Sequence, residues 1–195
     1  MDPQPVEPRK WTHIEVAVML TSHTALTELS IYDAMKIAPL MYTRPVKKGV
    51  VLMQEGTSSN SHMLLILDGD CVVENESMKK ADSLVLSVVG AGHIIGEMGV
   101  FDGEPRSATC KAFSDMEVAV LDKEALTKLI AQEPAVGCKL LAALLHRTSG
   151  RLRATNKKLR LLAQVTRSLE REIETLSKPA QSAPPAPFTG NPLMS

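Results

Sequence analysis

The sequence has few aromatic residues and few cysteines. Aromatic residues make up 3% of the 195 residues, which argues against the stacking surfaces that single-stranded nucleic-acid-binding proteins use. The cysteines Cys71, Cys110 and Cys138 are odd in number and widely spaced, with no CxxC pair. This spacing favours reduced thiols over a disulfide framework or a zinc site.

The sequence also lacks an excess of either charge and any long apolar run. Lys plus Arg and Asp plus Glu number 22 each, which argues against a duplex-DNA-binding protein that depends on phosphate neutralisation but leaves a local basic patch open. No apolar run reaches the length of a membrane span, and the N-terminus is polar and proline-rich, unlike a signal peptide. Together with the reduced cysteines, these features predict a cytoplasmic protein.

Catalytic motifs are missing as well. The histidines form no His-x-His pair of the kind a metal-binding cupin needs, and no serine or cysteine sits in a nucleophile motif. The N-terminal part of the sequence has no cysteine cluster of the kind that binds an iron–sulfur centre. We therefore predict that the protein is not an enzyme and holds no metal or cofactor. The histidines are His13, His23, His62, His93 and His146.

The first two segments of the chain differ in their hydrophobic pattern. Residues 1–14 carry three prolines between positions 3 and 8 and are expected to form a flexible tail. From residue 15 to about residue 41, apolar residues recur at spacings of three and four. This period predicts two or more short helices packed on a barrel, with a single amphipathic hairpin for a partner as the alternative.

Between Val46 and Asp122 the period changes to short apolar runs separated by glycines. Such runs are typical of an antiparallel sandwich or jelly roll. Asp68-Gly69 between two of the runs predicts a hairpin, because glycine supplies the positive φ that such turns need. The runs cover residues 50–53, 63–67, 71–73, 84–89, 108–112 and 118–121.

After Asp122 the pattern is helical again, with a short helix expected over 123–132 and a long one over 136–177. Two heptad positions of the long helix are mostly apolar, which predicts a parallel coiled coil between two copies. The alternative, a helix that only covers its own barrel, explains the apolar residues at 140–145. It does not explain the apolar residues at 159–176, because at about 1.5 Å per residue the helix extends beyond a small barrel. The two positions hold Leu141, Leu145, Thr148, Leu152, Thr155, Leu159, Leu162, Thr166, Leu169, Ile173 and Leu176.

The whole pattern predicts an α+β fold. Residues 15–135 are expected to form one domain, an antiparallel β jelly-roll barrel with the N-terminal helices beside it, and the long C-terminal dimerisation helix over 136–177 flanks this domain. The proline-rich residues 178–195 cannot bury a core and are expected to be a disordered tail.

The stretch GEMGVFDGEPRSAT, residues 96–109, opens with the carboxylate of Glu97, ends near the cation of Arg106 and offers a run of backbone N–H groups. Unpaired N–H groups at the start of a short helical turn stabilise an anion. The fork of Arg106 matches two phosphate oxygens, and Glu97 can accept a hydrogen bond from a sugar hydroxyl. These groups predict a small ligand with one negative charge and a ribose. A simple Arg106–Glu97 pair across a turn is the alternative.

This stretch resembles the phosphate-binding cassette of the cyclic nucleotide-binding domain family, which includes the bacterial catabolite activator protein and the regulatory subunits of cyclic-nucleotide-dependent kinases. The family pattern is Gly-Glu-(Leu or Met), a helical turn and Pro-Arg-(Ser, Thr or Ala)-Ala, and the resemblance extends from about residue 43 to residue 178. It implies that Arg106 holds the phosphate oxygens and that Glu97 accepts from the ribose 2′-hydroxyl. The pattern is filled by Gly96, Glu97, Met98, Pro105, Arg106, Ser107 and Ala108.

The resemblance assigns further contacts. Backbone amides near Gly96, Ser107 and Ala108 would complete the phosphate cradle, and Ser107 after the arginine favours cAMP over cGMP. On the long helix, Thr155 and Asn156 resemble the place where the catabolite activator protein contacts the purine with adjacent hydroxyl residues, although Asn156 departs from that pattern. Because Thr155 also lies on the heptad stripe, it could link ligand binding to helix pairing.

In the transcription-factor branch of this family a helix-turn-helix domain follows the long helix, whereas here a proline-rich tail follows Ser177. The resemblance therefore implies a stand-alone cyclic-nucleotide sensor, most simply a homodimer. It would signal by conformational change to a separate protein effector rather than by binding DNA. The alternative is a degenerate member that keeps the fold as an interaction module and binds no nucleotide.

Overall fold

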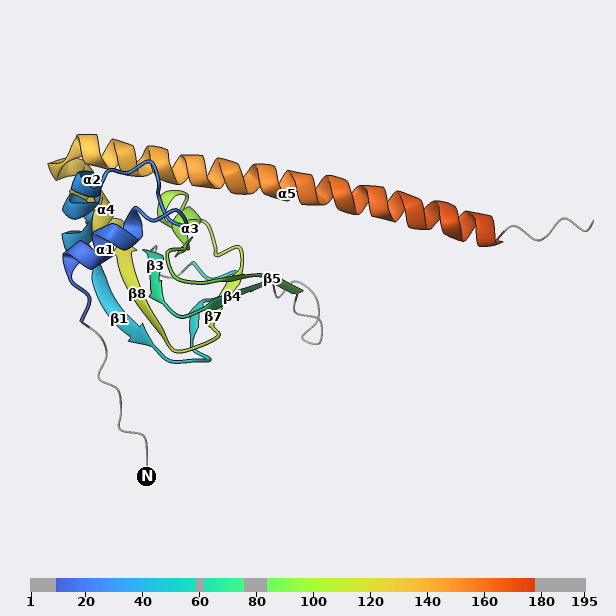
Figure 1. Cartoon of the computed structure of the whole chain (residues 1–195), viewed down its shortest axis with the longest axis horizontal. Helices are drawn as coiled ribbons and strands as arrows, with labels where there is room; N and C mark the ends of the chain where they lie inside the picture. Colours follow the sequence, from blue (N-terminus) through green and yellow to red (C-terminus); the bar gives the residue numbers. More distant parts are fainter. Residues whose placement is uncertain (1–9, 59–61, 76–83, 178–195) are drawn as a thin grey trace, which may run out of the picture. The chain divides into compact units, whose positions relative to one another are not determined.

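The computed structural model describes residues 10–58, 62–75 and 84–177 (Figure 1). The predicted tail at 178–195 and the first nine residues of the predicted N-terminal tail lie outside the described residues. The chain divides after Ser149 into two units, and each is described here by itself.

The first unit combines helices with two antiparallel sheets. Within the described residues the sheets have four strands each, in the orders β1-β8-β3-β6 and β2-β7-β4-β5. The helices are α1 (His13–Leu20), α2 (Ile31–Ile37), the 3-10 helix η1 (Ala38–Leu40), α3 (Glu97–Phe101), α4 (Lys123–Gln132) and α5 (Pro134–Ser177). The strands are β1 (Tyr42–Val46), β2 (Val51–Met53), β3 (His62–Asp68), β4 (Cys71–Asn75), β5 (Leu84–Val89), β6 (Ile94–Ile95), β7 (Thr109–Ala112) and β8 (Met116–Asp122). The predicted α+β fold is confirmed, with the difference that the strands form two sheets and the barrel is not closed.

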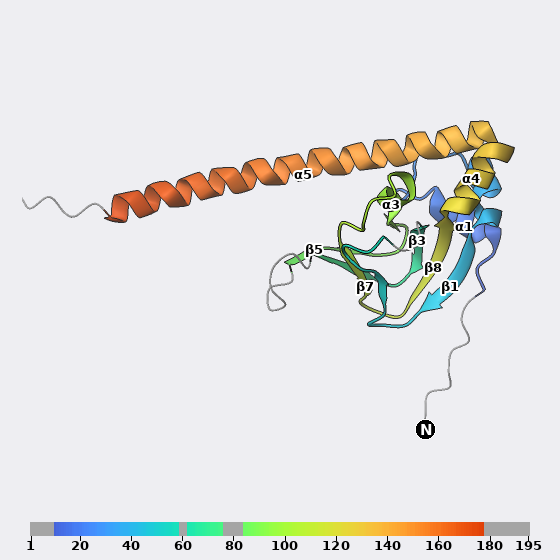
Figure 2. The ribbon, with the colours of Figure 1, turned by 180° about the vertical axis from the view of Figure 1, so that it is seen from behind.

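Strand β3 lies in the middle of the first sheet, beside β8, and both views of the ribbon show these strands next to each other (Figures 1 and 2). Successive side chains of a strand point to opposite faces of its sheet. Met63, Leu65 and Leu67 accordingly pack into a core shared with the helices. Leu64 and Ile66 pack into a second core, with residues of both sheets. Burial on both faces explains why β3 is a continuous apolar run.

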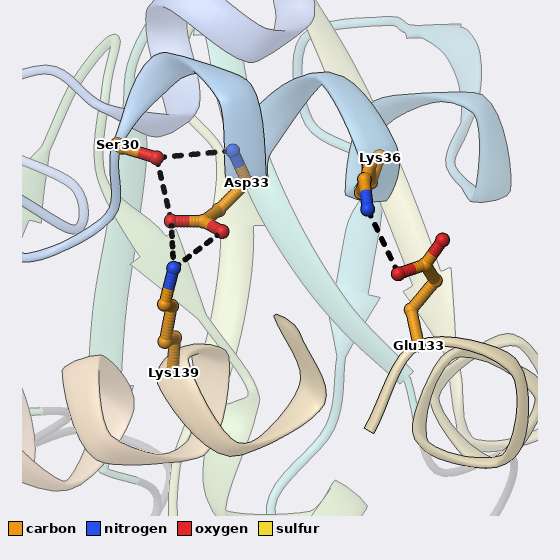
Figure 3. Close-up of polar contacts among 5 residues, drawn as sticks. All are labelled: Ser30, Asp33, Lys36, Glu133 and Lys139. Atoms are coloured by element: carbon orange, nitrogen blue, oxygen red, sulfur yellow. Dashed lines mark hydrogen bonds and ion pairs between the residues drawn. The ribbon is translucent and has the colours of Figure 1, made fainter. Parts of the chain in front are cut away.

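Ion pairs join α2 to the helices that follow the sheets (Figure 3). Asp33 accepts from Lys139 Nζ at 2.8 and 3.0 Å and from the Ser30 hydroxyl at 2.5 Å. Lys36 Nζ lies 2.8 Å from a carboxylate oxygen of Glu133. Because Lys139 belongs to the early turns of α5, these contacts hold α2 against the part of α5 that lies in the first unit.

The Asp33 contacts predict an acid-sensitive contribution to stability. Hydrogen bonds from Lys139 and Ser30 lower the pKa of Asp33 below its ordinary value. The lowered pKa stabilises the folded state above the unfolded-state pKa of about 3.9, and this stabilisation is lost as the pH falls through the folded-state pKa. We expect Asp33→Asn to reduce the free energy of unfolding by about 1 kcal/mol at pH 7, and by less near pH 3.

Urea unfolding at the two pH values measures this difference. The matched control is Asp70→Asn, because Asp70 is also an aspartate but is exposed, and it should change little at either pH. A loss for Asp33→Asn that is equally large near pH 3 would contradict the assignment.

In the second unit α5 continues as a helix to Ser177, and all residues from 151 to 177 are exposed. The apolar heptad residues are included: Leu159, Leu162 and Leu169 are 57%, 62% and 53% exposed. No helix within the described ranges is both long enough and apolar enough to cross a membrane.

Candidate functional site

The cassette begins where β6 ends, at Gly96. This residue caps α3 and has φ 77° and ψ 10°, in the left-handed region that glycine adopts without strain. A Cβ atom here would lie 2.2 Å from Met53 Cε and 3.0 Å from Arg106 Nη1. The left-handed backbone therefore favours glycine, and a side chain here would also require the flexible end of Met53 to shift.

Arg106 is buried, with 8% of its surface exposed, and several loops fix its position. Its Nη1 donates to the Gly96 carbonyl at 2.8 Å, and its Nη2 donates to the His62 carbonyl at 3.0 Å. Its backbone N–H donates to the Thr57 carbonyl, and its carbonyl accepts from the Gly56 N–H. The guanidinium is thus held at the junction of α3, β3 and the turn after β2.

The electrostatic setting of Arg106 is suited to an anion. Burial is the largest influence and lowers the pKa of Arg106, whereas Cys110 and the carboxylates of Glu97 and Asp102 act in the opposite direction. A buried cation is costly unless opposite charge and hydrogen bonds compensate it. An anion bound beside Arg106 would add opposite charge to this buried cation.

Glu97, in the first turn of α3, is 2% exposed and contributes negative charge close to Arg106. The two residues nevertheless line different hollows of the first unit. The hollow beside Arg106 measures about 280 Å³ and is lined by Val51, Leu52, Met53, Gln54, Thr57, His62 and Arg106. The hollow beside Glu97 measures about 330 Å³ and is lined by Glu97, Met98, Phe101, Asp102, Leu141, Leu144, Leu145 and Thr148.

The structure brings together six of the residues predicted for the site. They occupy one continuous segment of the first unit, from the end of β6 to the start of β7: Gly96, Glu97, Met98, Arg106, Ser107 and Ala108. Of these, Met98 and Ser107 are exposed and Ala108 is half-buried. Thr155 and Asn156 belong to the second unit, where both are exposed. Their contact with a base therefore stays a prediction.

Local sequence patterns do not reveal the residues on the other side of Arg106. Met53, Gln54 and Thr57 come from β2 and the turn after it, and His62 begins β3. The residues of β2 and its turn reach the site because β2 pairs with β7, the strand that follows the cassette, with Met53 opposite Cys110. His62 reaches it on β3, which pairs with β6, the strand before the cassette. Spacing along the sequence gives no signal for such a pairing.

Comparison with known proteins agrees with this geometry. The family model described as the cyclic nucleotide-binding domain matches residues 43–133, which include the whole cassette. A crystal structure of a cyclic nucleotide-binding domain from Methylobacillus flagellatus is 30% identical, with a TM-score of 0.66. That comparison covers 78% of this chain and 83% of the other.

Two curated relatives match over shorter parts of their length. A protein of Rhodopseudomonas palustris classed as a potassium channel is 33% identical over 114 residues, which are 58% of this chain and 27% of that protein. The cAMP-dependent protein kinase regulatory subunit of Yarrowia lipolytica is 29% identical over 105 residues, 54% of this chain and 27% of that protein. The chain thus spans about a quarter of each relative. With its filled cassette and its match to a solved domain over most of both chains, the chain belongs to the cyclic nucleotide-binding domain family.

Proposed function

We propose that the protein is a cAMP sensor that binds the cyclic phosphate at Arg106 and passes the signal to another protein. The observation that carries this proposal is the buried guanidinium, positioned by the Gly96 and His62 carbonyls within the complete cassette. A guanidinium offers five N–H donors in a fixed planar arrangement. Such a group can bind two oxygens of a phosphate once it is positioned.

The other cassette residues would orient the nucleotide. Glu97 is an acceptor and, in this proposal, accepts from the ribose 2′-hydroxyl. The amides near Gly96, Ser107 and Ala108 donate to the phosphate. The serine at position 107 supports cAMP over cGMP. The name of the Yarrowia lipolytica relative, a cAMP-dependent regulatory subunit, supports the same choice.

The proposed output is a change in quaternary structure that a protein effector reads. The apolar heptad residues of α5 are exposed from Leu152 onward, and pairing with a second copy would bury them. In this proposal the protein is a homodimer, catalyses no reaction and acts on its effector without binding DNA. Thr155 and Asn156 would contact the base from α5.

A thermal unfolding experiment tests ligand binding. cAMP at about a hundred times its Kd should add roughly 2.7 kcal/mol to the free energy of unfolding, since it binds only the folded state. The control ligand is adenosine, which lacks the phosphate that Arg106 would bind and should shift the Tm little. If neither cAMP nor cGMP at millimolar concentration raises the Tm of nucleotide-free protein, the degenerate interaction module becomes the better description.

A second experiment tests the role of Glu97. Hydrogen bonds to charged groups contribute about 1.5–3 kcal/mol, so Glu97→Ala should weaken cAMP binding at least tenfold in calorimetry. The same substitution should change the affinity for 2′-deoxy-cAMP little, because that analogue has no hydroxyl for Glu97 to accept from. The matched control is Glu104→Ala, an exposed carboxylate of the same segment. Equal losses for both ligands would show that Glu97 does not contact the 2′-hydroxyl.

A further inference from the structure

The equal numbers of acidic and basic residues conceal a difference between the two units of the chain. Residues 1–149 contain 14 Lys and Arg against 19 Asp and Glu, whereas residues 150–195 contain eight against three. Most of the cations of the second unit belong to α5, which continues to Ser177 as one helix (Figure 1). The second unit is therefore basic although the whole chain is neutral, and such an asymmetry points to an anionic partner.

Five cations of α5 form one basic stripe along the helix. They are separated by four, three, seven and four residues, and in a helix of about 3.6 residues per turn these spacings keep side chains on one face. The first and the last lie 18 residues apart, which is about 27 Å at about 1.5 Å per residue. The stripe lies on the side of α5 away from the two apolar heptad positions, so helix pairing would leave it accessible. Its members, all exposed, are Arg153, Lys157, Arg160, Arg167 and Arg171.

The chain itself supplies little negative charge to the basic stripe. Between residues 150 and 169 the sequence has no Asp or Glu, and within the described ranges no residue of the stripe takes part in an ion pair. Four of the five cations are arginines, whose planar guanidinium groups match the geometry of carboxylates and phosphates better than an ammonium group does. The stripe therefore offers positive groups at regular spacing to a partner that carries several anionic groups.

Two apolar residues beside the basic stripe indicate the class of this partner. Leu161 follows Lys157 by one helical turn and Val165 follows Leu161 by another. The two apolar residues are 53% and 55% exposed and lie outside the two heptad positions. A sugar-phosphate backbone offers charge but little apolar surface, and a membrane would bury the apolar heptad face, which the proposed homodimer uses. An acidic protein segment can contact both the stripe and its apolar border.

We propose that the basic stripe of α5 binds an acidic amphipathic helix of the effector. Carboxylates of that helix pair with the arginines, and its apolar residues cover Leu161 and Val165. The inference rests on the proposed protein effector and adds the chemistry of the surface that the effector presents. Complementary charge of this kind mainly selects the partner and speeds association, and salt weakens it.

Fluorescence anisotropy of a labelled peptide tests this surface in the full chain. The probe is a helical peptide of about 20 residues, long enough to match the basic stripe, with glutamates at the spacings of the stripe and leucines beside them. We expect saturable binding to the wild type that weakens at least tenfold when NaCl rises from about 0.05 M to about 0.5 M. The control peptide has the same composition, with its glutamates distributed around the helix, and should bind at least tenfold more weakly.

Two triple variants test whether the arginines of the stripe are responsible. The stripe variant should bind the probe at least tenfold more weakly than the wild type, because it loses three charge pairs. The control variant loses the same charge from exposed positions of the first unit and should stay within twofold. The stripe variant is Arg153→Gln, Arg160→Gln and Arg167→Gln, and the control variant is Arg44→Gln, Lys123→Gln and Lys128→Gln.

A pair of single variants tests the apolar border. Leu161→Gln should weaken binding of the probe at least threefold, because it removes an apolar contact. The matched control is Val18→Gln, since Val18 is also an aliphatic residue on a helix, 54% exposed in α1, and it should leave the affinity unchanged. Circular dichroism of each variant measures whether the helix content is kept.

The same assay with other polyanions separates the possible partners. If duplex DNA, or vesicles of phosphatidylcholine and phosphatidylglycerol, bind the stripe more tightly than the probe does, the acidic protein partner is overturned. Equal binding of the two peptides, or equal effects of the two triple variants, would overturn the docking surface itself. A protein that binds the probe as expected but fails to bind cAMP would overturn the cAMP sensor and support the surface. The reverse result would overturn the surface alone.

Discussion

Arg106→Ala is expected to bind cAMP at least tenfold more weakly than the wild type. The substitution removes the charged fork and leaves only neutral donors for the phosphate. Hydrogen bonds to charged groups contribute about 1.5–3 kcal/mol each, and 1.4 kcal/mol corresponds to tenfold in affinity. Isothermal titration calorimetry measures the change, and circular dichroism shows whether the sheets still form, since the Gly96 and His62 carbonyls lose a donor.

Two variants serve as controls for this result. Arg44→Ala removes an exposed arginine of β1 and should bind like the wild type. Arg106→Lys keeps a positive charge but lacks the planar fork, so its affinity should lie between those of the wild type and Arg106→Ala. Wild-type affinity in a folded Arg106→Ala protein would show that the phosphate is bound elsewhere.

A protein with Leu159→Asp and Leu162→Asp is expected to be monomeric. Both leucines are more than half exposed in the single chain, and the proposed pairing would bury them. Placing two carboxylates per chain in an apolar interface costs several kcal/mol, because isolated charges are poorly tolerated away from water. Multi-angle light scattering gives the mass directly, and calorimetry on the same samples gives the cAMP affinity.

Neighbouring residues of α5 provide a matched comparison. Leu161 is 53% exposed but lies outside the two heptad positions, so Leu161→Asp should weaken the dimer less than Leu162→Asp does. A double variant that stays dimeric would place the dimer interface elsewhere. A monomeric double variant with unchanged cAMP affinity would show that pairing and ligand binding are independent, because a ligand shifts an equilibrium only through different affinity for its two states.

Elements with local signals were predictable from the amino-acid sequence. The glycine, the Glu97 carboxylate and the arginine of the cassette lie within eleven residues of one another, and Gly96 has a left-handed backbone that glycine adopts without strain. The long helix was predictable for the same reason, because its heptad pattern repeats over short distances. Its predicted start at residue 136 lies close to the observed start at Pro134.

Long-range packing sets which distant segments surround the cassette. Arg106 is held by the His62 carbonyl, 44 residues away in the sequence, and Met53 packs against Gly96, where an added Cβ would lie 2.2 Å from Met53 Cε. These contacts depend on the pairing of β2 with β7 and of β3 with β6 and β8. The same pairings divide the described strands into two four-stranded antiparallel sheets, consistent with the sandwich or jelly roll that the apolar runs indicated, and leave the barrel open.

The physical reason is that strand pairing depends on interactions between segments far apart in the sequence. A period of two tells which side chains share a face, but it does not tell which strand lies alongside or in which register, and a one-residue slip exchanges the faces. The backbone hydrogen bonds that fix the register join residues far apart in the chain. The chemistry of the cassette was therefore visible in the sequence, whereas the wall of the hollow that faces Arg106 came only from the packing of the sheets.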